Sequence, residues 1–236
     1  MPIKTIKNYS PNFYIKKRLK KNIKLIIIHY TGMKSEKAAE KRLLKIQSEV
    51  SSHFLIKKNG DIIVLVPELY VAWHAGRSFW RGMESLNSKS IGIEITNPGH
   101  SFGYKNFSYK QIKSLKKLIR YLLKKYKINK KDVLGHSDVA PERKKDPGEK
   151  FPWAYLAKNK LSIWHNLSQN SLRKLRKKNC SKSERKIFIR NIIKIGYPIN
   201  SLTKTIIAFQ RRFRPELIDG KIDQECLKIS KSIIKF

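Results

Sequence analysis

The chain has few cysteines, few acidic residues and no long apolar segment, and each shortage excludes a class of protein. Cys180 and Cys226 are the only cysteines among 236 residues, too few for a disulfide framework or a zinc site built from cysteine. Apolar runs such as Leu25–Ile28 are far shorter than the roughly 20 residues of a membrane-spanning helix. No apolar segment follows the eight Lys and Arg residues of positions 1–24, so we expect no signal peptide and a cytoplasmic location.

The shortage of acidic residues leaves a large positive charge. The 53 Lys and Arg residues exceed the 17 Asp and Glu residues by 36, a balance that favours anionic partners such as nucleic acid, anionic lipid or an acidic polymer. However, 40 of the basic residues are lysine and only 13 are arginine, and lysine is a solvated point charge with little geometric specificity. We therefore favour compositional bias over specific nucleic-acid binding. Hydrophobic residues make up 40% of the chain, enough to exclude general disorder.

The first part of the chain alternates between strand and helix patterns. After a basic, mostly irregular lead-in over residues 1–23, the sequence predicts a buried strand at Lys24–Tyr30, a helix from a Ser35 cap to about Glu49, and a hairpin of Ser52–Lys57 and Asp61–Val66. Further along it predicts an aromatic-rich loop over 67–89, a strand at Ser90–Thr96, a helix from a Ser108 capping box to Tyr126, a short strand at Asp132–Gly135 and a loop over 136–153. This alternation predicts an α/β fold in which helices flank a mixed central β-sheet, with a catalytic domain over residues 24–165.

The remaining 71 residues have a different pattern. Residues 166–236 contain 18 basic and 5 acidic residues and no clear strand. Helical patterns recur near 183–194, 201–213 and 222–235. We therefore expect a small all-α C-terminal domain over 166–236.

Two histidines stand where predicted strands end. His29 lies at the end of the first buried strand, and His136 follows the short strand at Asp132–Gly135. Histidines at the strand ends of one sheet can converge on a metal, and a catalytic zinc site needs three protein ligands and one open position. Asp146, ten residues after His136, is within reach as the third ligand. By spacing alone such a triad also arises by accident.

A series of short motifs strengthens this hypothesis. They occur in the order His29-Tyr30-Thr31-Gly32, Val50-Ser51-Ser52-His53, Trp73-His74-Ala75-Gly76, Ser90-Ile91-Gly92-Ile93-Glu94, Gly135-His136-Ser137-Asp138-Val139-Ala140-Pro141, Arg143-Lys144-Lys145-Asp146-Pro147-Gly148 and Phe151-Pro152-Trp153. In this order they resemble the zinc N-acetylmuramoyl-L-alanine amidases, which share a fold with peptidoglycan recognition proteins. The resemblance covers about residues 10–155.

The resemblance implies a role for each matching residue. His29, His136 and Asp146 match the ligands of one Zn²⁺ per chain. Glu94 matches the acidic residue that takes a proton from the attacking water, and Lys144 matches the lysine that stabilises the oxyanion. Without the motif, Glu94 would be interpreted as a solvent-facing strand residue and Lys144 as one lysine among many.

Other aromatic and histidine residues divide into two groups. The resemblance implies that Trp73 and His74 line the substrate groove, although tryptophans such as Trp73 and Trp80 are more often part of a core. It leaves His53 as a structural residue of the hairpin. His100 and His165 match no motif and are given no role.

The C-terminal segment is similar to the small helical peptidoglycan-binding domains that accompany some of these amidases. The similar features are Phe209-Gln210 and Asp219-Gly220-Lys221-Ile222-Asp223, and the alternative is a helical appendage that never contacts glycan. The expected partner is peptidoglycan or a muropeptide, with no specific nucleic acid and no transmembrane segment, and we expect a monomer. A glycan-binding segment favours the cell envelope or periplasm as an alternative location.

Two other functions compete with the amidase. The first is a non-catalytic peptidoglycan-binding protein, and the second is a basic nucleic-acid-binding protein. The ordered motifs favour the amidase, because a binding protein needs no open metal site and charge alone does not explain the motifs.

Overall fold

A computed structural model describes residues 3–236. Within these residues six strands form a central sheet in the order β1-β5-β4-β9-β3-β10. Their bounds are β1 Ile6–Lys7, β3 Leu25–Tyr30, β4 Phe54–Ile56, β5 Ile62–Val64, β9 Ser90–Ile95 and β10 Val133–Gly135. Strand β3 pairs in parallel with both β9 and β10, β4 pairs in parallel with β9, and the predicted β4–β5 hairpin is antiparallel. The predicted α/β class with a mixed central sheet is confirmed.

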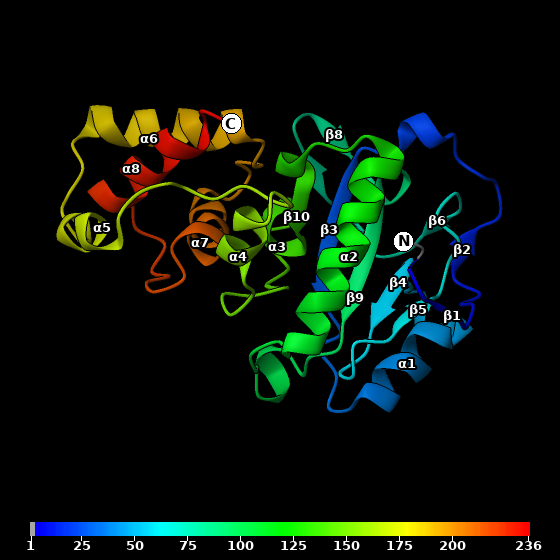
Figure 1. Cartoon of the computed structure of the whole chain (residues 1–236). Coiled ribbons are helices and arrows are strands. Elements are labelled where there is room, and N and C mark those ends of the chain that lie inside the picture. Colours follow the sequence, from blue (N-terminus) through cyan, green and yellow to red (C-terminus); the bar gives the residue numbers. More distant parts are fainter. Residues whose placement is uncertain (1–2) are drawn as a thin grey trace.

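Strand β3 is buried on both faces because its side chains alternate between two cores. Ile26 and Ile28 enter the core beneath α2 Tyr109–Tyr126, whereas Leu25 and Ile27 enter the core on the opposite face. The helix α2 covers the first face of the sheet (Figure 1). It begins at the predicted capping box, in which Ser108 and Gln111 exchange side-chain and backbone hydrogen bonds.

Several predicted elements differ in extent from those observed. The helix predicted to run to Glu49 is α1 Glu36–Leu44, which ends because Lys45 has an extended backbone conformation. The loop predicted over 136–153 begins as a helical turn, α3 His136–Val139. The aromatic loop over 67–89 contains three short strands, β6 Val71–Ala72, β7 Phe79–Trp80 and β8 Met83–Glu84. The lead-in contributes β1 and also β2 Phe13–Tyr14, which pairs with β6.

The C-terminal helices lie beside the β10 edge of the sheet, with α7 nearest to α3 and α4 (Figure 1). The three predicted helices are α6 Lys182–Ile195, α7 Leu202–Phe213 and α8 Gln224–Ile233. Two further helices, α4 Trp153–Lys158 and α5 Gln169–Leu175, are not predicted by the sequence patterns. A single apolar cluster joins this segment to the sheet, and its members include Leu25, Ile27, Trp80, Leu134, Val139, Ile195, Tyr197, Phe209 and Phe213. The boundary near residue 165 therefore stays a prediction, and shared core packing crosses it.

Among residues 3–236, no helix combines the length and the apolarity that crossing a membrane requires.

Trp80 provides a test of this shared core. Its side chain is 1% exposed, and its ring centroid lies 5.1 Å from that of Tyr197. We expect Trp80→Ala to lower the free energy of unfolding by about 3–5 kcal/mol, because a buried aromatic leaves a cavity. Urea unfolding followed by fluorescence and by far-ultraviolet circular dichroism should show one coincident transition. Tyr155→Ala, at a side chain 41% exposed, is the control and should cost less than about 0.5 kcal/mol. Two separate transitions would show that the two segments unfold independently.

Candidate metal centre

Three parallel strands deliver the candidate site residues to one edge of the sheet. His29 lies near the carboxyl end of β3 and is in register with Glu94 on β9. His136 follows the last residue of β10, which is also parallel to β3. The carboxyl ends of parallel strands form the usual binding crevice of such sheets.

The three predicted ligands meet at this edge. His29 Nδ1 and His136 Nδ1 are 2.9 Å apart, and Asp146 Oδ2 lies 3.1 Å from the first and 3.0 Å from the second. All three residues are buried, and together they form a group that could hold a metal ion. Asp146 reaches the site because its backbone carbonyl accepts a hydrogen bond of 2.8 Å from the N–H of Ser137, in the turn that carries His136.

A chain of hydrogen bonds fixes which nitrogen of His29 carries the proton. The Ser90 hydroxyl donates to the carbonyl of Leu86 at 2.6 Å, so its oxygen is free to accept a hydrogen bond from the Nε2–H of His74 at 3.3 Å. His74 Nδ1 is then an acceptor, and it receives the Nε2–H of His29 at 3.1 Å. The lone pair of His29 is therefore on Nδ1, the atom that faces the other ligands.

His136 is oriented in the same sense by a backbone carbonyl. Its Nε2 lies 3.1 Å from the carbonyl oxygen of Ala75, which can only accept, so Nε2 carries the hydrogen and Nδ1 carries the lone pair. With both rings neutral, two imidazole lone pairs and one carboxylate oxygen converge on one point. This arrangement needs a cation, and two imidazoles with one carboxylate are a donor set that suits zinc.

The protonation states of these groups suit metal binding. Burial, together with the nearby His136, lowers the pKa of His29 to about 4, so the ring is neutral at pH 7. Burial by itself would raise the pKa of Asp146, but hydrogen bonds and positive charge from protonated His136 and His29 outweigh it and hold the pKa well below the usual range. A metal ion would take the place of those protons. Asp146 is therefore ionised, as a ligand must be.

Glu94 lies in the same cavity and does not face solvent as a strand glutamate usually does. Its Oε2 atom is buried and has no hydrogen-bond partner among the described residues. Burial raises the pKa of Glu94 to about 8; the negative charge of Asp146 adds to the rise, and Lys144 opposes it. An unpartnered carboxyl group with a pKa near neutrality can both accept and release a proton under ordinary conditions.

The cavity has a volume of about 750 Å³ and contains both polar and aromatic side chains. Lys144, Trp73 and His74 are among the residues that line it. Both ring nitrogens of His74 already have partners within the protein, so its predicted role in binding substrate stays a prediction.

His53 and His100 differ in what the structure assigns to them. Nδ1 of His53 accepts the N–H of Gly92 at 3.0 Å, which agrees with the structural role predicted for it. His100 matches no sequence motif, yet His100 lines the cavity. Its Nδ1 lies 2.8 Å from the hydroxyl of Tyr30. His100 begins a single 3₁₀ turn, His100–Phe102, after β9.

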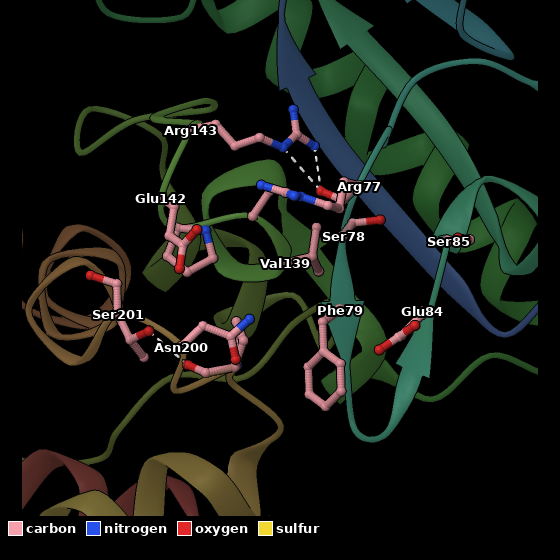
Figure 2. A pocket seen from close by; sticks show the side chains of 14 residues that line it. Arg77, Ser78, Phe79, Glu84, Ser85, Val139, Glu142, Arg143, Asn200 and Ser201 are labelled. Carbon is pink, nitrogen blue, oxygen red and sulfur yellow. Dashed lines mark hydrogen bonds between the residues drawn. The ribbon is translucent and has the colours of Figure 1, made fainter.

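A second cavity, of about 490 Å³, lies between the β7–β8 hairpin, the loop after α3 and the start of α7 (Figure 2). Arg143 lines both cavities. Its guanidinium donates to the carbonyl oxygens of Ala75 and Arg77, at 2.6 Å each (Figure 2 draws the bonds to Arg77). Ala75 O thus accepts hydrogen bonds from both Arg143 and the predicted ligand His136.

Comparison with known proteins agrees with this geometry. The family model of N-acetylmuramoyl-L-alanine amidase matches residues 19–149, more than half of the chain. The chain belongs to the N-acetylmuramoyl-L-alanine amidase family. The amidase AmiD of Escherichia coli is 33% identical over 231 residues, which cover 90% of this chain and 83% of AmiD. The amidase AmpD of the same organism is 41% identical over 105 residues, or 44% of this chain and 55% of AmpD.

Solved structures of amidases extend the likeness to the whole fold. A complex of E. coli AmiD with anhydro-N-acetylmuramic acid-L-Ala-D-γ-Glu-L-Lys has a TM-score of 0.79 at 31% identity and covers 91% of this chain and 89% of its own. AmpDh3 of Pseudomonas aeruginosa also has a TM-score of 0.79, at 28% identity, and covers 95% of this chain and 96% of its own. Each of these two structures covers more than nine-tenths of this amidase. The likeness therefore reaches beyond the sheet into the 71 residues of the C-terminal segment.

The desolvated carboxyl group of Glu94 predicts a pH-dependent stability of the metal-free amidase. Its pKa is higher in the folded protein, about 8, than the ordinary value of 4.5, so between these values the folded state holds more protons and stability falls as pH rises. Glu94→Gln removes this penalty. In chelator, its free energy of unfolding should match that of the wild type near pH 4.5 and exceed it above pH 8, by on the order of a few kcal/mol.

Urea unfolding across this pH range measures the difference. Glu142→Gln changes an exposed side chain on the loop after α3 and should give no such trend. A Glu94→Gln advantage that is constant with pH would contradict the raised pKa of Glu94.

Proposed function

We propose that this amidase is a zinc hydrolase that cleaves the amide bond between N-acetylmuramic or anhydromuramic acid and the L-alanine of peptidoglycan or muropeptides. The observation that carries the proposal is the convergence of three ligand atoms at the strand ends, in the cavity where the buried Oε2 atom of Glu94 has no hydrogen-bond partner among the described residues. The muropeptide in the AmiD complex supports the substrate class.

The metal-binding part of the proposal assigns His29, His136 and Asp146 as the ligands of one Zn²⁺. Bound zinc lowers the pKa of a water molecule and polarises a carbonyl oxygen, which are the two difficulties of amide hydrolysis. The three residues leave room for a further ligand, as in other catalytic zinc sites. The hydrogen bonds from His29 to His74 and from His136 to Ala75 hold both rings in the ligating tautomer.

The proton-transfer part of the proposal assigns Glu94 and Lys144. Glu94 Oε2 takes a proton from the attacking water and later delivers one to the nitrogen of the departing alanine, so that the carboxyl group ends each cycle as it began. The ammonium group of Lys144, which lines the same cavity, stabilises the oxygen that becomes negative when the carbonyl is attacked. Trp73 lines the cavity wall where the substrate would lie.

The large positive charge supports the same substrate class. Muropeptides carry carboxylates, and a surface with an excess of 36 positive charges attracts them at low ionic strength. We propose that the chain acts as a monomer, either on soluble anhydromuropeptides in the cytoplasm or on the polymeric wall in the cell envelope.

The decisive experiment supplies the two substrates side by side. Purified sacculi and purified anhydromuropeptides are incubated with zinc-loaded protein, and released peptides with a free L-alanine amine are identified by mass spectrometry. Peptide release should fall by about 10²–10⁴-fold in Glu94→Gln, because the shape of the side chain is kept but the proton acceptor is lost. Binding of either substrate without peptide release would favour a non-catalytic peptidoglycan-binding protein, and the ratio of the two rates indicates which substrate is natural.

The metal assignment predicts about one zinc per chain. His136→Ala should lose the zinc, because two ligands alone hold it poorly, whereas His53→Ala should keep it, since His53 contacts the backbone of Gly92 and not the metal group. Elemental analysis after dialysis measures the zinc content of each variant. Loss of zinc from His53→Ala with retention in His136→Ala would mean that a different histidine is the ligand.

The lysine assignment predicts a difference between two neighbouring residues. Lys144→Ala should lower kcat by about 10²–10³-fold with little change in KM, because the charge acts mainly in the transition state. Lys145→Ala removes the same charge from the next residue, which lines the same cavity but does not match the motif position, and should change kcat only slightly. Steady-state kinetics on a small muropeptide distinguish the two outcomes, and equal losses would show that both lysines act only through general charge.

A further inference from the structure

The buried Asp138 connects the metal centre to the C-terminal helices. It lies on the turn α3, two residues after His136, and is 0% exposed. Its Oδ2 accepts the N–H of Gly135 at 2.7 Å, and its Oδ1 accepts the hydroxyl of Tyr197 at 2.7 Å. Among residues 3–236, Arg212 of α7 is the cation that forms a salt bridge with Asp138.

Arg212 holds both sides of His136 at once. One guanidinium nitrogen donates to Asp138 after His136, and the other donates at 3.0 Å to the carbonyl of Val133 at the start of β10, before His136. The guanidinium is 4.2 Å from the centroid of the Trp153 ring, and Arg212 is 3% exposed. The strand that leads to His136 and the turn that follows it are therefore bound to the same rigid planar group.

The turn α3 determines the position of two of the three proposed ligands. It carries His136 directly, and its Ser137 N–H holds the backbone of Asp146. A displacement of the turn would therefore move both ligands relative to His29, which lies on the central strand β3. Zinc sites depend on such surrounding contacts, whose loss typically weakens metal affinity by about 10–100-fold.

We propose that Arg212 and Tyr197 of the C-terminal segment are positioning residues for the metal centre, which act through Asp138 on the turn that holds His136 and Asp146. This inference rests on the proposed zinc site and adds a role for the C-terminal helices that does not involve glycan. The segment completes the metal-binding geometry from outside the region of residues 19–149 that the family model matches.

The test measures zinc affinity in the full-length chain by competition with a chromogenic chelator. Arg212→Met keeps much of the side-chain volume but leaves Asp138 buried without its cation, and we expect zinc affinity to fall by about 10–100-fold. Tyr197→Phe removes one hydroxyl and should lower affinity by less than about tenfold. Arg212→Lys keeps the charge but not the two-sided contact, so it should restore only part of the affinity.

Arg214→Met is the matched control. Arg214 is also buried, but it pairs with Asp219 and Asp223 inside the C-terminal segment and not with Asp138. It should lower the thermal unfolding temperature of the metal-free protein as Arg212→Met does, yet leave zinc affinity near that of the wild type. Equal losses of zinc affinity in Arg212→Met and Arg214→Met would overturn the proposal, because they would reflect general loosening of the segment.

A double variant separates positioning from simple damage. Asp138→Asn combined with Arg212→Met removes the uncompensated charge, so the pair should lose less zinc affinity than the sum of the two single losses predicts. Strict additivity would contradict direct coupling of Asp138 and Arg212. If Arg212→Met does not fold, Tyr197→Phe and Arg212→Lys decide the question by the same measurement.

Zinc binding and peptide release in the wild type test the proposed function, whereas zinc affinity in the variants tests the positioning role. A wild-type protein that binds zinc tightly but releases no peptide would refute the proposed hydrolysis and leave the positioning role in place. A wild-type protein that binds zinc and cleaves, with Arg212→Met and Tyr197→Phe that bind zinc equally well, would refute the positioning role alone.

Discussion

The rest of the site depends on one constraint, the close approach of three acceptor atoms. These are Nδ1 of His29, Nδ1 of His136 and Oδ2 of Asp146. Such a group is unfavourable inside a protein unless a cation joins it, and buried hydrogen bonds behind both histidines keep it in place. Behind His29, hydrogen bonds through His74 and Ser90 direct the lone pair of the ring inward. Behind His136, the carbonyl of Ala75 has the same effect. The sheet supplies the rigid background, because β3 and β10 are hydrogen-bonded neighbours and their ends cannot separate without breaking the core.

Much of this fold is predictable from short-range patterns. The strand at β3, the β4–β5 hairpin and the helix α2 follow from apolar periodicity and from a turn or cap signal within a few residues. The end of α1 is not predictable in this way, because Lys45 becomes extended where the apolar pattern continues to Ile46. The four-residue turn α3 is too short for any periodicity, and a side chain 74 residues away in sequence holds it.

The site shows the same division between local and long-range information. The motifs identify His29, His136, Asp146, Glu94 and Lys144 as a set, and the structure places them around one cavity. They do not reveal that Oε2 of Glu94 is buried, because alternation along β9 takes no account of side chains that lie far away in the sequence. They also do not reveal that His74 contacts His29, since that contact depends on how the loop after β6 passes behind β3.

The basic residues that the structure describes differ in burial, because some arginines are buried and the lysines are not. Among residues 3–236 the buried cations are Arg18, Arg211, Arg212 and Arg214, and no lysine is buried. Arg211, Arg212 and Arg214 form internal ion pairs, for which a planar guanidinium is suited, and Arg18 donates to backbone carbonyls. This distribution agrees with compositional bias as the origin of most of the positive charge.

Gly92 makes the hydrogen-bond relay possible by having no side chain. A Cβ atom at this position would lie 2.5 Å from the ring of His74, closer than non-bonded atoms can approach, so His74 could not occupy its place behind His29. The glycine in the Ser90-Ile91-Gly92-Ile93-Glu94 strand is thus coupled to a histidine 18 positions earlier in the chain. A larger residue at this position, in a variant or a distant relative, would displace the histidine equivalent to His74. That histidine could then no longer accept the Nε2–H of His29, and another group would have to fix the tautomer of His29.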